Sequence, residues 1–83
     1  MNKWEKLMNK FLSLSKDVRF DEIRKVLEFY GYKMTIPRGG SSHHIFRKEG
    51  KEPIVIPKHD IIKKVYVERI KKVIEEELHN EDN

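Results

Sequence analysis

The sequence has 83 residues, of which 39% are charged, and it carries a formal net charge of +4. This length allows one domain with one modest hydrophobic core, which excludes a multidomain enzyme. Because the chain has no cysteine, disulfide bridges, thiolate zinc sites and cysteine nucleophiles are excluded as well.

Charge is distributed unevenly along the chain. Acidic residues concentrate near the end, in Glu75-Glu76-Glu77 and Glu81-Asp82, so the preceding part is more basic than the total suggests. A basic body favours a polyanionic partner. A lysine-rich and glutamate-rich solvated surface, common in proteins from hot environments, explains the same composition about equally well. Since we find neither a signal peptide nor a membrane-length apolar stretch, we expect a cytoplasmic protein without membrane contact.

Two amphipathic helices are predicted in the first third of the chain. Apolar residues at positions 4, 7, 8 and 11 follow one helical stripe, which indicates a short helix over residues 4–12. A second stripe from Phe20 to Tyr30 predicts a helix that ends at Gly31, a residue well suited to cap a helix C-terminus. Asp17 or Asp21 is expected to cap its start.

Three short strands follow, and the last segment is again helical. Residues 32–36 alternate apolar and polar, while residues 42–47 and 53–56 are further strands separated by turns rich in glycine and proline. Apolar spacing from Val67 to Leu78 predicts a last helix of about four turns. We therefore expect an α+β sandwich, in which helices cover one face of a three-stranded antiparallel sheet and the other face stays open.

Two adjacent histidines follow a glycine-serine turn in the segment "GGSSHHIF". Because side chains alternate across a strand, His43 and His44 must face opposite sides of the sheet. Phe46 is the larger apolar group, so we expect His44 on the helix-covered side with Phe46, and His43 on the open side with Arg47. His44 is then best explained as a structural residue, and His43 as an accessible group suited to proton transfer at cellular pH.

Basic residues are expected around His43. Arg38, Arg47, Lys48, Lys58 and His59 would attract a phosphodiester and stabilise negative charge in its transition state. The alternatives for the histidines are weaker: no carboxylate or cysteine is near enough in sequence to complete a metal site, and a serine neighbour on the same strand faces away. We therefore expect no metal and no cofactor.

The chain resembles the HicA toxins of prokaryotic toxin–antitoxin pairs, which are small ribonucleases with a fold like that of double-stranded-RNA-binding domains. The resemblance extends from about Val18 to Glu77. It rests on "RFDEIRKVLEFYGY", on "GGSSHHIF", which resembles the family's Gly-Ser-His signature, and on "IVIPKH", which is similar to its Pro-x-His segment.

The resemblance implies a metal-independent endoribonuclease that cleaves messenger RNA and is silenced by a HicB antitoxin covering the site. His43 is then the catalytic histidine, acting as general base or acid while the RNA 2′-hydroxyl attacks the adjacent phosphate. One additional serine in the signature would make His44 the functional residue if the register slips. Ser42 and His59 are further candidates for catalysis or RNA contact, and the expected RNA-binding residues are Arg38, Gly40, Arg47, Lys48 and Lys58.

This interpretation divides the chain into three parts. Residues 1–16 form an N-terminal helical extension suited to docking or dimerisation, residues 17–79 form the ribonuclease domain, and residues 80–83 form a disordered tail. A homodimer and a hetero-oligomer with the antitoxin are both compatible with the sequence. Two rival functions remain open: a non-catalytic RNA-binding module with the same fold, and a basic docking face for an acidic protein.

Overall fold

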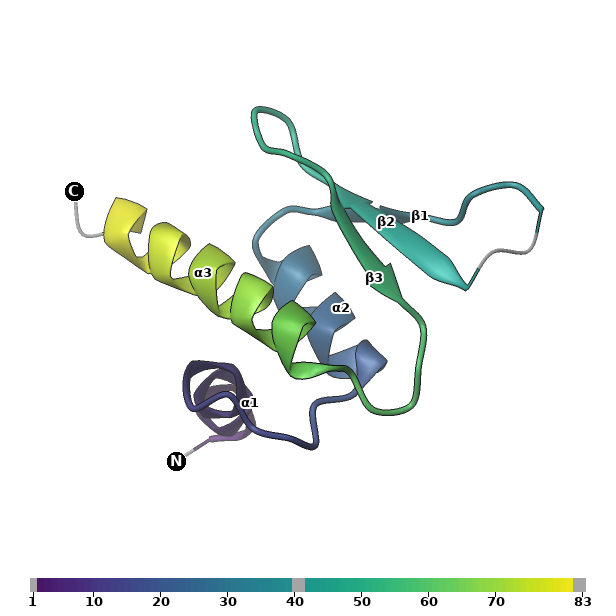
Figure 1. The fold of residues 1–83 in the computed structure, drawn as a ribbon. Coiled ribbons are helices and arrows are strands. Elements are labelled where there is room, and N and C mark those ends of the chain that lie inside the picture. Colours follow the sequence, from purple (N-terminus) through teal and green to yellow (C-terminus); the bar gives the residue numbers. More distant parts are fainter. Residues whose placement is uncertain (1, 40–41, 82–83) are drawn as a thin grey trace.

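The computed structural model describes residues 2–39 and 42–81, and within them the elements follow the expected order. They are helices α1 (Lys3–Leu12) and α2 (Phe20–Phe29), strands β1 (Lys33–Thr35), β2 (His43–Arg47) and β3 (Ile54–Pro57), and helix α3 (Lys64–Glu81). The strands form an antiparallel sheet in the order β1-β2-β3, and the helices lie on one side of it (Figure 1). The predicted α+β sandwich, like a small double-stranded-RNA-binding domain, is confirmed.

Element bounds differ from the expected ones by a few residues. β1 is shorter than residues 32–36, β2 begins at His43, and β3 is shifted by one residue toward the C-terminus. α3 has 18 residues and reaches Glu81, because nothing in its glutamate-rich end breaks a helix. Residues 80–81, expected in a tail, are therefore helical, and residues 82–83 lie outside the described part.

The start of α2 corrects the expected cap. Neither Asp17 nor Asp21 caps it; instead the backbone N–H of Arg19 donates to Glu22 Oε1 at 2.9 Å. A glutamate in the third helical position reaches back to the capping residue in this way. Asp17 accepts a hydrogen bond from the Ser15 hydroxyl, which, with the nearby Lys10 ammonium, lowers the pKa of Asp17.

The end of α2 follows the prediction. Gly31 has φ of +94°, a conformation that favours glycine. Its N–H donates to the Glu28 carbonyl at 3.1 Å, and the Tyr32 N–H donates to the Leu27 carbonyl at 2.9 Å, which is the Schellman arrangement. This motif turns the chain directly into β1.

One core joins all three helices to the covered face of the sheet. Its fully buried side chains are Phe11, Val18, Ile23, Val26, Leu27, Phe46, Ile56, Val67, Ile70 and Ile74. α1 contributes Phe11 to this core, and the Lys10 ammonium bonds Glu22 at 2.9 Å, so α1 is held against the rest of the domain. Leu78 is 41% exposed, although its spacing placed it on the buried stripe of α3.

Candidate active site on the open face of the sheet

The side chains of β2 alternate between the two faces of the sheet. His44 and Phe46 are buried against the helices, His43 and Arg47 are exposed on the other face, and Ile45 is half-buried there. The predicted facing of the two histidines is confirmed. Of the side chains expected to meet RNA, His43 and Arg47 therefore project from the open face.

His44 is held by contacts within the fold. Its Nδ1 lies 3.2 Å from the Ser42 carbonyl oxygen, and its ring packs edge-on against Phe20 at a centroid distance of 5.1 Å. A carbonyl can only accept, so this hydrogen bond requires a proton on Nδ1. With 7% of its surface exposed, His44 serves as a packing residue.

His43 lies beside the end of β3. The strand register places it opposite Pro57, and the Lys58 N–H donates to the Ser42 carbonyl at 2.7 Å. Lys58 and His59 come directly after Pro57 in sequence, so they lie near His43 although they are far from the glycine-serine turn along the chain. Both are exposed. Ser42 is exposed too, and its carbonyl accepts hydrogen bonds from His44 Nδ1 on β2 and from the Lys58 N–H after β3.

Further residues of the open face were missed by the sequence interpretation. Lys33 pairs with Arg47 in the register of β1 and β2, and Val55 pairs with Ile45 in that of β2 and β3. Lys33 is exposed and Val55 is 42% exposed. Combining strand alternation with an assumed register would have found both. They give the open face an apolar centre with basic side chains at its end.

Lys48 lies away from the basic side chains of the open face. Its ammonium bonds Glu77 Oε1 on α3 at 2.8 Å and lies 5.7 Å from the centre of the Tyr32 ring. Lys48 therefore lies on the helix-covered side of the sheet. Arg38 is exposed in the connection between β1 and β2, and Gly40, expected to contact RNA, lies outside the described residues.

The sequence of this domain matches a known family. The model of the family described as the HicA toxin of bacterial toxin–antitoxin systems matches residues 20–75, more than half of the chain. The chain belongs to the HicA toxin family. A comparison with curated proteins and one with solved structures give no match.

The segment that matches the HicA family model contains the whole sheet and both histidines. The match includes α2, the three strands and α3 as far as Glu75, while α1 lies outside it. As a toxin family of toxin–antitoxin systems, it implies an antitoxin protein as partner.

No three histidine, aspartate or glutamate side chains of residues 2–39 and 42–81 gather in a way that could hold a metal ion. Over the same residues, no helix has the length and apolar character needed to cross a membrane.

Proposed function

We propose that this chain is a metal-independent endoribonuclease toxin in which His43 transfers the proton of the reaction. The observation that carries the proposal is the exposure of His43 on the open face, in a chain of the HicA family, while its neighbour His44 is buried. Only an exposed imidazole can reach a phosphodiester of a folded or single-stranded RNA.

The chemistry follows from the substrate. His43 as general base takes the proton of the ribose 2′-hydroxyl, the 2′-oxygen bonds to the adjacent phosphorus, and the bond to the 5′-oxygen breaks. A proton from water or from His59 completes the leaving 5′-hydroxyl, and the other product ends in a 2′,3′-cyclic phosphate. One positioned histidine supplies about a hundredfold to ten-thousandfold, so a slow enzyme is expected.

Basic side chains of the open face would position the RNA backbone. Arg47 and Lys33 lie at one end of β2 and Lys58 lies near the other end, on either side of the apolar pair Ile45 and Val55. Arg38 and Gly40 belong to the connection before β2. Phosphate contacts release counterions, so binding should weaken steeply with salt.

The same face is the proposed binding site of a HicB-type antitoxin. Val55 is 42% exposed and pairs with Ile45 in the strand register, which leaves apolar surface near the candidate catalytic residue. Burying this surface under a partner protein is favourable and would exclude RNA from His43. Antitoxin and RNA should therefore compete for the chain.

The first test compares expression of the wild type, His43→Ala and His44→Ala in a bacterial host, following growth and messenger RNA integrity. We expect arrest and RNA loss with the wild type and relief with His43→Ala. With purified protein and chelator present, cleavage should fall about a hundredfold or more in His43→Ala, while RNA affinity changes by only a few fold.

A matched substrate separates the enzyme from a non-catalytic RNA-binding module. An RNA with a single 2′-deoxy nucleotide at the cleaved position lacks the attacking group, so it should bind normally and stay intact. If the folded wild type binds RNA but cleaves none without metal, the binding module is the better interpretation. If His44→Ala, still folded, is the variant that loses cleavage, the assignment to His43 is wrong.

A further inference from the structure

Helix α3 carries its charges in the order opposite to the one that a helix prefers. Its first nine residues, 64–72, contain four basic residues and one acidic residue, whereas residues 73–81 contain four acidic residues and no lysine or arginine. The N-terminal end of a helix has partial positive charge and its C-terminal end has partial negative charge. The distribution in α3 is therefore unfavourable for the helix alone, and a surface with the opposite charge order would complement it.

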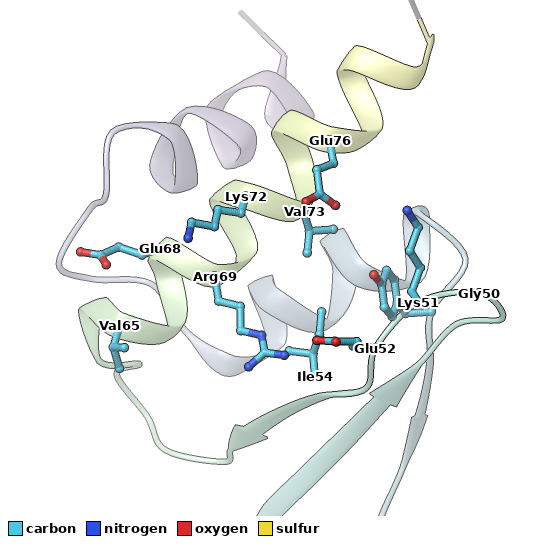
Figure 2. Close-up of a pocket in the computed structure, with 11 residues that line it drawn as sticks. Gly50, Lys51, Glu52, Ile54, Val65, Glu68, Arg69, Lys72, Val73 and Glu76 are labelled. Atoms are coloured by element: carbon cyan, nitrogen blue, oxygen red, sulfur yellow. The ribbon is translucent and has the colours of Figure 1, made fainter.

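One face of α3 lines an open groove. The groove has a volume of about 720 Å³ and lies between α3 and the segment that leads through the turn after β2 into β3 (Figure 2). From α3 it is lined by Val65, Glu68, Arg69, Lys72, Val73 and Glu76. These positions follow the spacing of a single helical stripe, about 17 Å long.

Exposed apolar surface accompanies the charges on this stripe. Val65 is 63% exposed, whereas Ile54 and Val73, which also line the groove, are 3% and 9% exposed. Figure 2 shows Arg69 and Glu76 projecting from α3, with Lys51 and Glu52 on the opposite wall. The groove thus offers both apolar area and charged side chains of both signs.

An added β-strand does not fit this groove. It would have to pair with the free edge of β3, and neither Pro53, just before that strand, nor Pro57, at its end, has an N–H to donate. The Pro53 carbonyl already accepts from Arg69 Nη2 at 3.2 Å. A helix, whose backbone needs no partner, is the better occupant.

We propose that the stripe of α3 is a self-association surface, on which a second copy of this chain docks its own α3 in the antiparallel direction. In that arrangement the basic half of each helix faces the acidic half of the other, which also sets the two helix dipoles against each other favourably. A register centred between Lys72 and Val73 places Arg69 opposite Glu76 of the second copy, and two-fold symmetry repeats the pair.

The side chains of this pair are able to make the contact. Arg69 and Glu76 are both exposed. Arg69 donates one N–H to the Pro53 carbonyl. A guanidinium has five N–H groups, so the remaining ones can bond a carboxylate of the second copy. The surface lies apart from the open face with His43, so self-association does not depend on the proposed ribonuclease function.

A charge exchange tests the proposal on the purified 83-residue chain by sedimentation equilibrium at low salt. We expect a concentration-dependent dimer that dissociates as salt rises. Arg69→Glu and Glu76→Arg each create two repulsive pairs, so each should weaken dimerisation about tenfold or more, and the double variant should restore it to within about threefold of the wild type.

Two controls keep the result specific. Arg24 and Glu28 form an exposed pair on α2 at 3.4 Å, so Arg24→Glu and Glu28→Arg match the changes in net charge and should leave dimerisation unchanged. Because the chain has no cysteine, Lys72→Cys next to the two-fold axis should form a disulfide dimer on oxidation, whereas Lys25→Cys on α2 should not.

Several results would overturn the proposal. A chain that stays monomeric at about millimolar concentration and low salt has no such surface. A dimer that ignores the charge reversals, or a double variant no better than the single ones, places the contact elsewhere. Reversals that change only the affinity for RNA or for an antitoxin assign the stripe to that partner. Circular dichroism of each variant verifies that it is folded.

Discussion

His43 and His44 are adjacent in the sequence and lie in opposite environments. His43 is exposed beside Pro57, while His44 is 7% exposed, packs against Phe20 and bonds the Ser42 carbonyl. The difference arises from the period of two residues in a β-strand. It teaches that the face of the sheet, and not the residue type, separates side chains that stabilise this domain from those that can meet a partner.

The largest expected contrast in stability is between Phe46 and Ile45. Phe46 is fully buried and contacts Phe20 at a centroid distance of 6.1 Å, so Phe46→Ala should cost about 3–5 kcal/mol of unfolding free energy. Ile45→Ala, on the half-buried open face, should cost about 1 kcal/mol. Urea unfolding measures both. Equal losses would show that the two faces are equally packed.

The histidines themselves give the next contrast. His44→Ala removes the hydrogen bond to Ser42 and the packing on Phe20, so we expect a loss of about 1–3 kcal/mol. His43→Ala should cost about 1 kcal/mol or less, although we expect it to lose most of the cleavage activity. Thermal unfolding of the two variants measures their stability, and cleavage assays at a temperature where both variants are folded measure their activity. A stability loss in His43→Ala as large as in His44→Ala would contradict this contrast.

Arg47 and Lys48 extend the comparison to binding. Arg47→Ala on the open face should lower RNA affinity and reduce the slope of log affinity against log salt by about 1. Lys48→Ala should leave that slope unchanged and cost about 1 kcal/mol of stability, because the Lys48 ammonium bonds Glu77. Salt titrations of RNA binding test the pair. A shift in slope for Lys48→Ala alone would reverse the assignment.

The smallest expected effect is a loss of stability at alkaline pH, caused by Tyr32 on the helix-covered side of the sheet. Burial raises the pKa of Tyr32 above its usual value of 10.0. In the unfolded chain this phenol loses its proton near pH 10, whereas the folded state keeps it, so stability should fall as pH rises above about 10. Tyr32→Phe should weaken this decline. Unfolding between about pH 8 and pH 11 measures it, and parallel curves for both proteins would exclude Tyr32 as its source.

Local signals explain why much of the fold could be predicted. The stripe from Phe20 to Tyr30, the conformation of Gly31 and the alternation around Phe46 act over a few residues, and each gave the element that the structure contains. The cap of α2 was predicted wrongly because several acidic residues stand near its start. Which of them reaches the Arg19 N–H depends on where the first turn begins.

Contacts between distant residues explain what could not be predicted. Pairing of Lys48 with Glu77, of the Lys58 N–H with the Ser42 carbonyl, and of Arg69 with the Pro53 carbonyl depends on how the sheet and helices pack. The sequence allowed Lys48 to be a phosphate contact, since nothing in its neighbourhood shows that α3 approaches it.

The sequence by itself determined the order of the elements, the opposite facing of His43 and His44, and the reversed charges of α3, because these follow from helical and strand periods along one segment. Only the tertiary structure decided which side chains share a surface. Strand register brought Pro57 beside His43, and packing of α3 beside β3 formed the groove lined by Arg69 and Glu76. Those arrangements require chain segments far apart in sequence to meet, and no local pattern specifies where they do.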